Sequence, residues 1–191
     1  MKPAILVVIG ASGSGKTAAV RQVAARALPG VRCCHFDAVG VPSREEMERD
    51  FGGGEQWQAL TTQRWLDRFA TDPDGAAVYV LDGQTRPSFV SRAAERAGIG
   101  VARVVLLDCA SPVRHVRLIE PRAQAELANP HMDCWAAYLR GQADALGLPV
   151  VDTTSLQIEA VADALVTQIE IARAQQLSLE RRHLDRDRSH H

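Results

Sequence analysis

The chain of 191 residues has few of the features that mark specialised protein classes. Its 4 cysteines lack the spacing of a metal site, and adjacent Cys33 and Cys34 lie in an apolar stretch where we expect buried, reduced thiols. No apolar run approaches the length of a membrane span, and the run at 4–9 is too short for a signal peptide. A formal net charge of −1 argues against nucleic acid as a partner. We therefore expect a cytoplasmic protein without a membrane partner; nothing in the sequence indicates an oligomeric state.

Lysine is the scarcest of the charged residues. Of the 22 basic residues only Lys2 and Lys16 are lysines, and the others are arginines. In a chain that uses arginine almost everywhere, a lysine at position 16 indicates a specific chemical requirement at that position.

Apolar runs and amphipathic segments alternate along the chain about five times. The strands are expected at 4–9, 31–36, 76–81, 101–107 and 149–151. The helices are expected at 17–28, 43–70 with a break at 52–54, 87–97, 111–120, 132–146 and 156–176. This alternation predicts an α/β domain with a parallel sheet and right-handed crossovers.

The expected helices also suggest how the chain is divided. We expect a single domain over 1–180, with a helical insertion at about 43–71 that begins with a capping box of Ser43 and Glu46. A polar segment at about 114–131 has the character of a lid. The charged tail at 181–191 is expected to fray, and its end, Arg188 to His191, has the composition of a tag remnant.

Residues 10–17 match the pattern G-x-x-x-x-G-K-[ST] in full, between a buried strand and an amphipathic helix. Backbone N–H groups of such a turn surround phosphate oxygens, and the following helix presents its positive dipole end. We expect Lys16 to reach the β and γ phosphates and the Thr17 hydroxyl to bind Mg²⁺. The predicted nucleotide-binding residues are Gly10, Ala11, Ser12, Gly13, Ser14, Gly15, Lys16 and Thr17.

Acidic residues follow three of the expected strands, at the sheet edge where ligands bind in α/β proteins. Asp82 ends an apolar strand in a Walker B pattern, which predicts a ligand of Mg²⁺; a loop or cap acid is the alternative. Asp37 is placed to accept a proton from an attacking hydroxyl, or is an ordinary turn aspartate. Asp108 is expected to be structural.

Arginines near these strand ends are candidates for stabilising phosphoryl charge. Arg86 follows Asp82 closely, and Arg122 lies inside the lid segment. Arg114 and Arg117, three residues apart, fit a solvated helix face better.

The helical insertion carries candidates for contact with an acceptor. These are Glu55, Trp57 and Arg64, although Trp57 and Trp65 share one helical face and also fit core packing. Thr153 to Ser155 could contact a nucleotide base, but Thr154 or Ser155 as a helix cap is the better interpretation.

In the order of these parts the chain resembles the P-loop kinases of small molecules, the gluconate, shikimate and nucleoside monophosphate kinase group. Shorter stretches, 36–43 and 127–135, resemble uncharacterised bacterial ATP-binding proteins described as AAA-family ATPases. The resemblance implies a three-layer P-loop NTPase fold with a five-stranded parallel sheet of order 2-3-1-4-5, and use of ATP (or GTP) with Mg²⁺. Two departures stand out: the second strand is not followed by Asp-x-Asp, and the lid lacks a close arginine pair.

The sequence thus predicts transfer of the γ-phosphoryl group from ATP to a small-molecule acceptor, a hydroxyl or a phosphate. Lys16, Asp37, Arg86 and Arg122 are the expected catalytic residues. One alternative is a polynucleotide or sugar-nucleotide kinase, which would need a basic groove leading to Asp37. Another is a nucleotide-dependent switch or slow ATPase with a protein partner, which would need an exposed apolar face around Trp57.

Overall fold

A computed structural model describes residues 2–120 and 123–188 of the chain and contains a five-stranded parallel sheet. The strands are β1 (Ala4–Ile9), β2 (Val31–His35), β3 (Val78–Asp82), β4 (Ala102–Asp108) and β5 (Val150–Asp152). Their order is β2-β3-β1-β4-β5, and every pairing is parallel. The predicted fold class and strand order are confirmed.

Position in the sheet explains how far each strand is buried. All six residues of central β1 are buried, because neighbours cover both edges and helices cover both faces. β2 lies at an edge, so Cys33 and Cys34 are only half-buried, which corrects the expectation of buried thiols. Burial nevertheless raises the pKa of Cys33 to about 11, so this thiol stays protonated.

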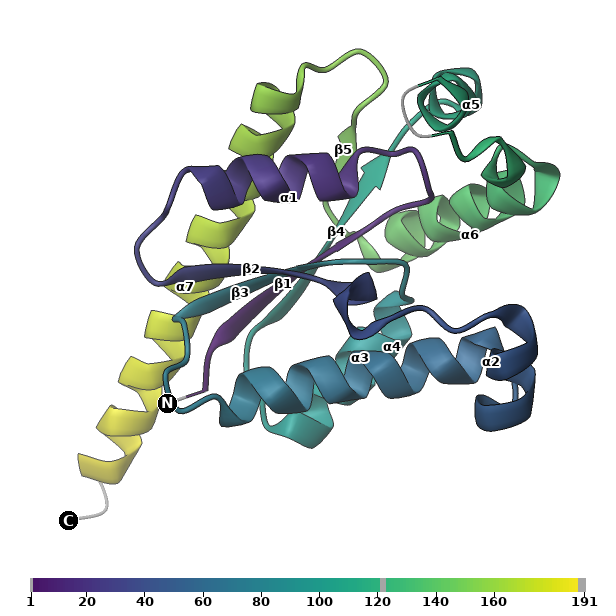
Figure 1. Cartoon of the computed structure of the whole chain (residues 1–191). Helices are drawn as coiled ribbons and strands as arrows, with labels where there is room; N and C mark the ends of the chain where they lie inside the picture. The colour runs from purple at the N-terminus through teal and green to yellow at the C-terminus, as the bar shows by residue number, and fades with distance from the viewer. Residues whose placement is uncertain (1, 121–122, 189–191) are drawn as a thin grey trace.

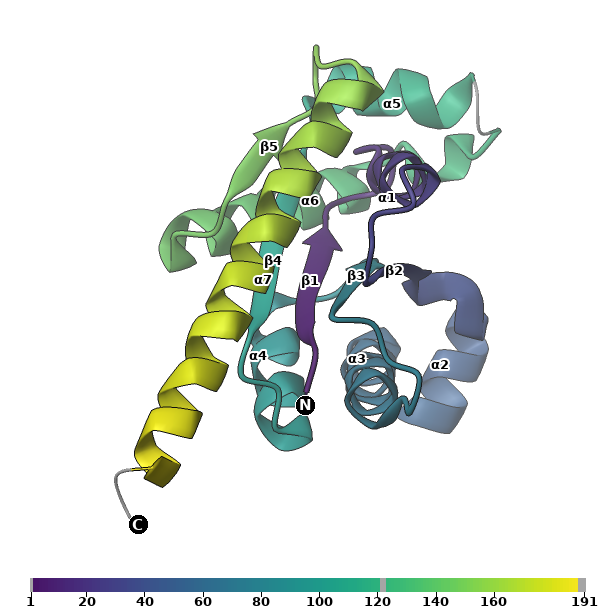
Figure 2. The same cartoon turned by 90° about the vertical axis from the view of Figure 1, so that its left-hand side faces the viewer.

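Helices cover the two faces of the sheet in separate layers (Figures 1 and 2). α1 (Lys16–Ala25) and α7 (Ile158–Arg188) pack with the β1 side chains of Leu6 and Val8. α3 (Gly54–Thr71), α4 (Pro87–Ala97) and α6 (Pro130–Leu146) pack with Ile5, Val7 and Ile9 on the other face. The alternation of β1 side chains thus divides the core into two clusters and makes a three-layer fold.

The helical insertion consists of α2 (Arg44–Phe51) and α3. α2 begins with the predicted capping box: Ser43 Oγ accepts from Glu46 N, and Ser43 N donates to Glu46 Oε2. The chain turns at Gly52 and Gly53, as expected from the break at 52–54. α3 carries Leu66 and buried aromatic rings into the core, so the insertion is anchored on the sheet.

Helix α7 differs from its prediction at both ends. It begins at Ile158, so Thr154 and Ser155 do not cap it; the Thr154 hydroxyl instead accepts from Ala110 N. It continues to Arg188, past the expected end near 176 and through the tail predicted to fray. The extension is rich in Leu and Arg, which favour helix, and contains neither glycine nor proline. Residues 189–191 lie outside the described part of the chain.

The remaining elements follow the carboxyl ends of β2 and β4. A 3₁₀ turn (Phe36–Val39) comes directly after β2. α5 (Ser111–Ile119) and a second 3₁₀ turn (Ala125–Leu127) lie between β4 and α6. Within the described ranges, no helix combines the length and the apolar character needed to cross a bilayer.

Candidate functional site

The glycine-rich loop leaves the end of β1 and leads directly into α1, which begins at Lys16. Gly13 has φ +84°, and a Cβ there would lie 2.5 Å from Arg114 Cγ and 2.8 Å from the Arg114 carbonyl oxygen. Only glycine therefore allows α5 to pack so closely on the loop. The result is a turn held at the amino end of a helix, the arrangement that binds phosphate.

Lys16 extends back across this loop. Its ammonium donates to the carbonyl oxygens of Gly10 at 2.8 Å and Ala11 at 3.0 Å, and the residue is 8% exposed. The hydroxyl of Ser14 is buried without a hydrogen-bond partner among the described residues. The loop thus concentrates donors in a small buried volume, as recognition of an anion requires.

A cavity of about 520 Å³ opens on one side of the loop; we name it the α7-side cavity. Its wall is largely apolar, and its lining residues are Gly13, Ser14, Gly15, Ala18, Arg117, Thr153, Leu156, Ile158 and Val161. Arg117 donates to the Thr153 carbonyl oxygen at 2.7 Å, and the Thr153 hydroxyl donates to the Ser14 carbonyl oxygen at 2.9 Å. The loop after β5 is therefore tied to the phosphate-binding loop.

A second cavity, of about 410 Å³, lies on the opposite side, beneath α3; we name it the α3-side cavity. Its lining residues are Asp37, Val41, Met47, Gly54, Glu55, Trp57, Gln58, Gln84, Arg86, His131, Met132 and Trp135. Ser12 connects it to the loop, because its hydroxyl accepts from Gln84 Nε2 at 2.6 Å and its N–H donates to Met132 Sδ. The glycine-rich loop thus lies between two cavities.

Asp37 lies in the 3₁₀ turn after β2 and faces the α3-side cavity. Burial raises the pKa of its carboxyl group, nearby Asp82 raises the pKa further, and Lys16 and His35 oppose the rise. The carboxylate is therefore within electrostatic reach of both the loop lysine and the acid that ends β3.

Asp82 is 3% exposed at the carboxyl end of β3. Its Oδ1 lies 2.7 Å from His35 Nδ1, and the strand register places these two residues side by side. His35 occupies the strand end two residues before Asp37, at the position where the resemblance would place the first aspartate of Asp-x-Asp. An imidazole and a carboxylate thus form a fixed pair beside the loop.

Arg86 reaches the α3-side cavity from the amino end of α4, with its side chain 20% exposed. Its guanidinium donates to Gln58 Oε1 at 2.5 Å and lies 3.1 Å from Glu55 Oε2. The same group lies 5.1 Å from the ring centre of Trp135 on α6. Side chains from two helices, α3 and α6, therefore hold this arginine in place.

The sequence-predicted site residues separate in the structure. Asp37, Glu55, Trp57 and Arg86 line one cavity, whereas exposed Arg64 lines a different cavity of about 240 Å³ with Trp65 and Arg68. Trp57 lines both cavities, so the predicted contact of Arg64 with the acceptor stays a prediction. Trp57 is 7% exposed and packs edge-on against Phe36, so it serves the core as well as the cavity wall.

The arginines of the predicted lid have mixed outcomes. Arg114 is 2% exposed and donates to the Cys109 carbonyl oxygen and to Asp133, so the prediction of a solvated face is wrong. Its partners lie on neighbouring elements that the spacing on one helix does not reveal. Arg122 lies outside the described residues.

The sequence analysis missed five residues that line the α3-side cavity: Gln58, Gln84, His131, Met132 and Trp135. It also missed His35, the partner of Asp82. Arg117 was assigned to a solvated face, whereas it bonds Thr153 and lines the α7-side cavity. Gln84 and His35 are next to or near strand-end acids, so their positions carried a usable signal. Trp135 fitted the apolar stripe of α6 and gave no separate signal.

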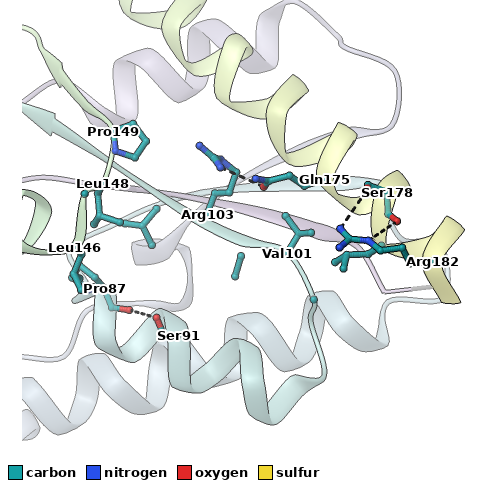
Figure 3. A pocket seen from close by; sticks show the side chains of 15 residues that line it. Pro87, Ser91, Val101, Arg103, Leu146, Leu148, Pro149, Gln175, Ser178 and Arg182 are labelled. Carbon is teal, nitrogen blue, oxygen red and sulfur yellow. Dashed lines mark hydrogen bonds between the residues drawn. The ribbon is translucent and has the colours of Figure 1, made fainter.

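A further cavity, of about 640 Å³, lies elsewhere (Figure 3). It is bounded by Val101 and Arg103 at the start of β4 and by Gln175, Ser178 and Arg182 on α7. The start of a parallel strand is at the sheet edge opposite to the glycine-rich loop. This distal cavity is therefore separate from the site described above.

No family model matches the sequence, and no curated protein sequence matches it. Several solved structures match the fold of the chain. A gluconokinase from Sinorhizobium meliloti is 18% identical with a TM-score of 0.66, and the match covers 92% of this chain and 97% of that one. A sugar kinase from Janibacter is 20% identical with a TM-score of 0.56, over 90% and 97%. A shikimate kinase from Acinetobacter baumannii, solved with shikimate, is 17% identical with a TM-score of 0.51, over 88% and 93%. The chain therefore has the fold of the P-loop small-molecule kinases.

Proposed function

We propose that the protein transfers the γ-phosphoryl group of ATP, with Mg²⁺, to a small acceptor held in the α3-side cavity. The observation that carries this proposal is the position of the glycine-rich loop between two cavities, one for a donor and one for an acceptor. A hydrolase needs only the first cavity, whereas a phosphotransferase needs both. The kinase fold of the structural neighbours is consistent with this.

The donor occupies the loop and the α7-side cavity in this proposal. Loop N–H groups and Lys16 bind the phosphates, and the apolar wall beside Arg117 receives the base. GTP could use the same phosphate contacts, so the base preference depends on that wall.

Thr17 and Asp82 would hold Mg²⁺, whose role is to neutralise charge on the phosphates. Mg²⁺ prefers oxygen ligands and keeps several waters, so one hydroxyl, one carboxylate and the phosphates suffice. The described residues fit this donor set: Asp82 is a buried carboxylate at a strand end, and no group of three or more His, Cys, Asp or Glu side chains within 2–120 and 123–188 could hold a metal alone.

Asp37 would orient the acceptor and take its proton. The acceptor oxygen bonds to the γ-phosphorus, its proton passes to the Asp37 carboxylate, and the bond to the bridging oxygen breaks to leave ADP. Arg86 holds the acceptor side of the cavity, and we assign Arg122 to the transferring phosphoryl group. Positioning and electrostatics supply most of the catalysis in such transfers.

Each of the two alternative functions needs a surface feature that can be compared with the structure. A polynucleotide kinase needs a basic groove, but the charged lining of the α3-side cavity includes two carboxylates and one guanidinium. A partner-binding switch needs an exposed apolar face around Trp57. This indole is 7% exposed, whereas Val39 and Val41, which line cavities with it, are each 55% exposed.

An acceptor screen tests the proposal. ATP consumption is measured with sugars, nucleosides, nucleotides, organic acids and oligonucleotides, with Asp37→Asn as the matched variant. We expect at least one small acceptor to raise consumption above the basal rate, and Asp37→Asn to reduce that increment about 10²- to 10⁴-fold. If ATP consumption with every small acceptor equalled the basal rate without acceptor, the proposal would be contradicted.

A further inference from the structure

We infer that the acceptor is an uncharged, polyhydroxylated molecule with an apolar face, a sugar or a nucleoside, and not a carboxylate or a phosphate ester. This inference rests on the proposed function, because it concerns the same α3-side cavity. It follows from how the charges and apolar groups of that cavity are already paired.

The cavity's arginine is already paired with a carboxylate. Arginine frequently recognises a carboxylate or phosphate through two parallel N–H groups of its guanidinium. In Arg86 one terminal nitrogen donates to Gln58 and the other lies 3.1 Å from Glu55. An anionic acceptor would have to compete with Glu55 for this charge.

The other charges near the cavity repel an anion. Asp37 lines the wall, and buried Asp82 is close enough to raise the pKa of Asp37. The positive charge of Lys16 lowers the pKa of Asp37, but in the proposed function the phosphates of ATP neutralise this charge. His131 is exposed at the start of α6 and is the remaining basic group of the lining. An acceptor carboxylate in this lining would face the carboxylates of Asp37 and Glu55, and the guanidinium of Arg86 is already paired with Glu55.

The uncharged lining suits hydroxyl groups beside an apolar surface. The amides of Gln58 and Gln84 can both donate and accept, as hydroxyl groups do. The indoles of Trp57 and Trp135 and the thioether of Met132 form the apolar part of the wall. Trp135 Nε1–H has no hydrogen-bond partner among the described residues, so a ligand hydroxyl could satisfy it. This combination of amide and apolar groups suits a ring-shaped polyol.

Binding to matched pairs of probes tests the inference directly. The pairs are D-glucose with D-glucuronate, D-galactose with D-galacturonate, and adenosine and uridine with their 5′-monophosphates. Tryptophan fluorescence is titrated with Mg²⁺ and a non-hydrolysable ATP analogue present, so that the donor side is filled. We expect at least one neutral probe to bind about tenfold or more tightly than its charged partner. Comparing the neutral sugars with the neutral nucleosides then shows which of these two acceptor classes binds.

Two results would overturn the inference. One is that, in each pair with a detectable affinity, the charged probe binds as tightly as the neutral probe or more tightly. The other is the absence of binding by every neutral probe up to about 10 mM. Phosphoryl transfer to the same probes separates this outcome from the proposed function. Neutral binding without transfer counts against the proposed function alone, and transfer to a charged probe counts against the inference alone.

Glu55→Gln provides an independent check, because it removes the charge that pairs with Arg86. We expect the preference for the neutral member of a pair to narrow by about tenfold, through tighter binding of the charged member. Glu45→Gln is the matched control, since Glu45 is exposed on α2 and does not line the cavity. An unchanged preference in Glu55→Gln would show that Glu55 does not control acceptor charge.

Discussion

At the scale of single residues, the His35–Asp82 pair connects the edge strand to the predicted magnesium ligand. The 2.7 Å contact between His35 Nδ1 and Asp82 Oδ1 fixes the orientation of a buried carboxylate. We predict that His35→Ala lowers catalytic efficiency about 10- to 100-fold and raises the Mg²⁺ concentration needed for half-maximal activity. A magnesium titration of ATP consumption measures both effects.

The conservative variant separates positioning from general damage to the fold. In His35→Asn the side-chain amide nitrogen has the same connection to the backbone as Nδ1 and can donate to Asp82. We expect His35→Asn to recover much of the magnesium dependence that His35→Ala loses. If both variants behave like the wild type, His35 has no role in positioning Asp82.

The raised pKa of Asp37 predicts how activity depends on pH. Burial raises the pKa of its carboxyl group above the ordinary value of 3.8. Because the base must be ionised, activity should fall as pH decreases through this raised pKa, at a higher pH than for an ordinary aspartate. The acid limb of the kcat/KM profile measures it, and Asp37→Asn should remove the limb with most of the activity.

The same shift predicts the effect of Asp37 on stability. A carboxyl group whose pKa is raised by folding binds its proton more tightly in the folded state. Its ionised form therefore opposes folding above the raised pKa, and this cost disappears as pH falls below it. Asp37→Asn should be at least as stable as the wild type at neutral pH. A lower melting temperature would mean that the carboxylate makes stabilising contacts, and the activity loss would then need another explanation.

At the scale of elements, the sequence was informative where burial leaves a continuous pattern. The runs at 4–9 and 101–107 predicted strands because both faces of a central strand are apolar, and Ser43 with Glu46 predicted a helix start. The end of α7 was missed, because its last turns have no stop residue and little packing. Arg114 was misjudged and Trp135 was missed, because their partners are on other elements. Such contacts exist only after folding.

Helix α7 offers a matched pair of substitutions. Leu165 is 0% exposed in the core, whereas Leu184 is 60% exposed in the extension beyond the predicted end. We predict that Leu165→Ala lowers the free energy of unfolding by about 2–5 kcal/mol, because it leaves a cavity. Leu184→Ala should change it by less than about 0.5 kcal/mol. Urea unfolding measures both, and a loss above about 1 kcal/mol for Leu184→Ala would mean that the extension packs against another surface.

At the scale of the whole molecule, the glycine-rich loop couples nucleotide binding to global stability. A ligand that binds only the folded state stabilises it by about 2.7 kcal/mol at a concentration 100 times its dissociation constant. For a chain of this size that is a rise in melting temperature of roughly 5–10 °C. We predict this shift for Mg²⁺ with a non-hydrolysable ATP analogue, measured by differential scanning fluorimetry.

The two lysines of the chain provide the variant and its control. Lys16→Ala should remove most of the nucleotide-dependent shift, because it deletes the cation of the loop. Lys2→Ala should keep it, since the Lys2 ammonium donates to the Ala70 carbonyl oxygen at the exposed start of the chain. The nucleotide-dependent rise in melting temperature is compared between the variants, and not the melting temperature itself, because Lys16 also bonds the loop in the absence of nucleotide.

If Lys16→Ala retained the shift, the nucleotide would bind outside the loop. The distal cavity with Arg103 and Arg182 would then be the site to test, through Arg103→Ala (Figure 3).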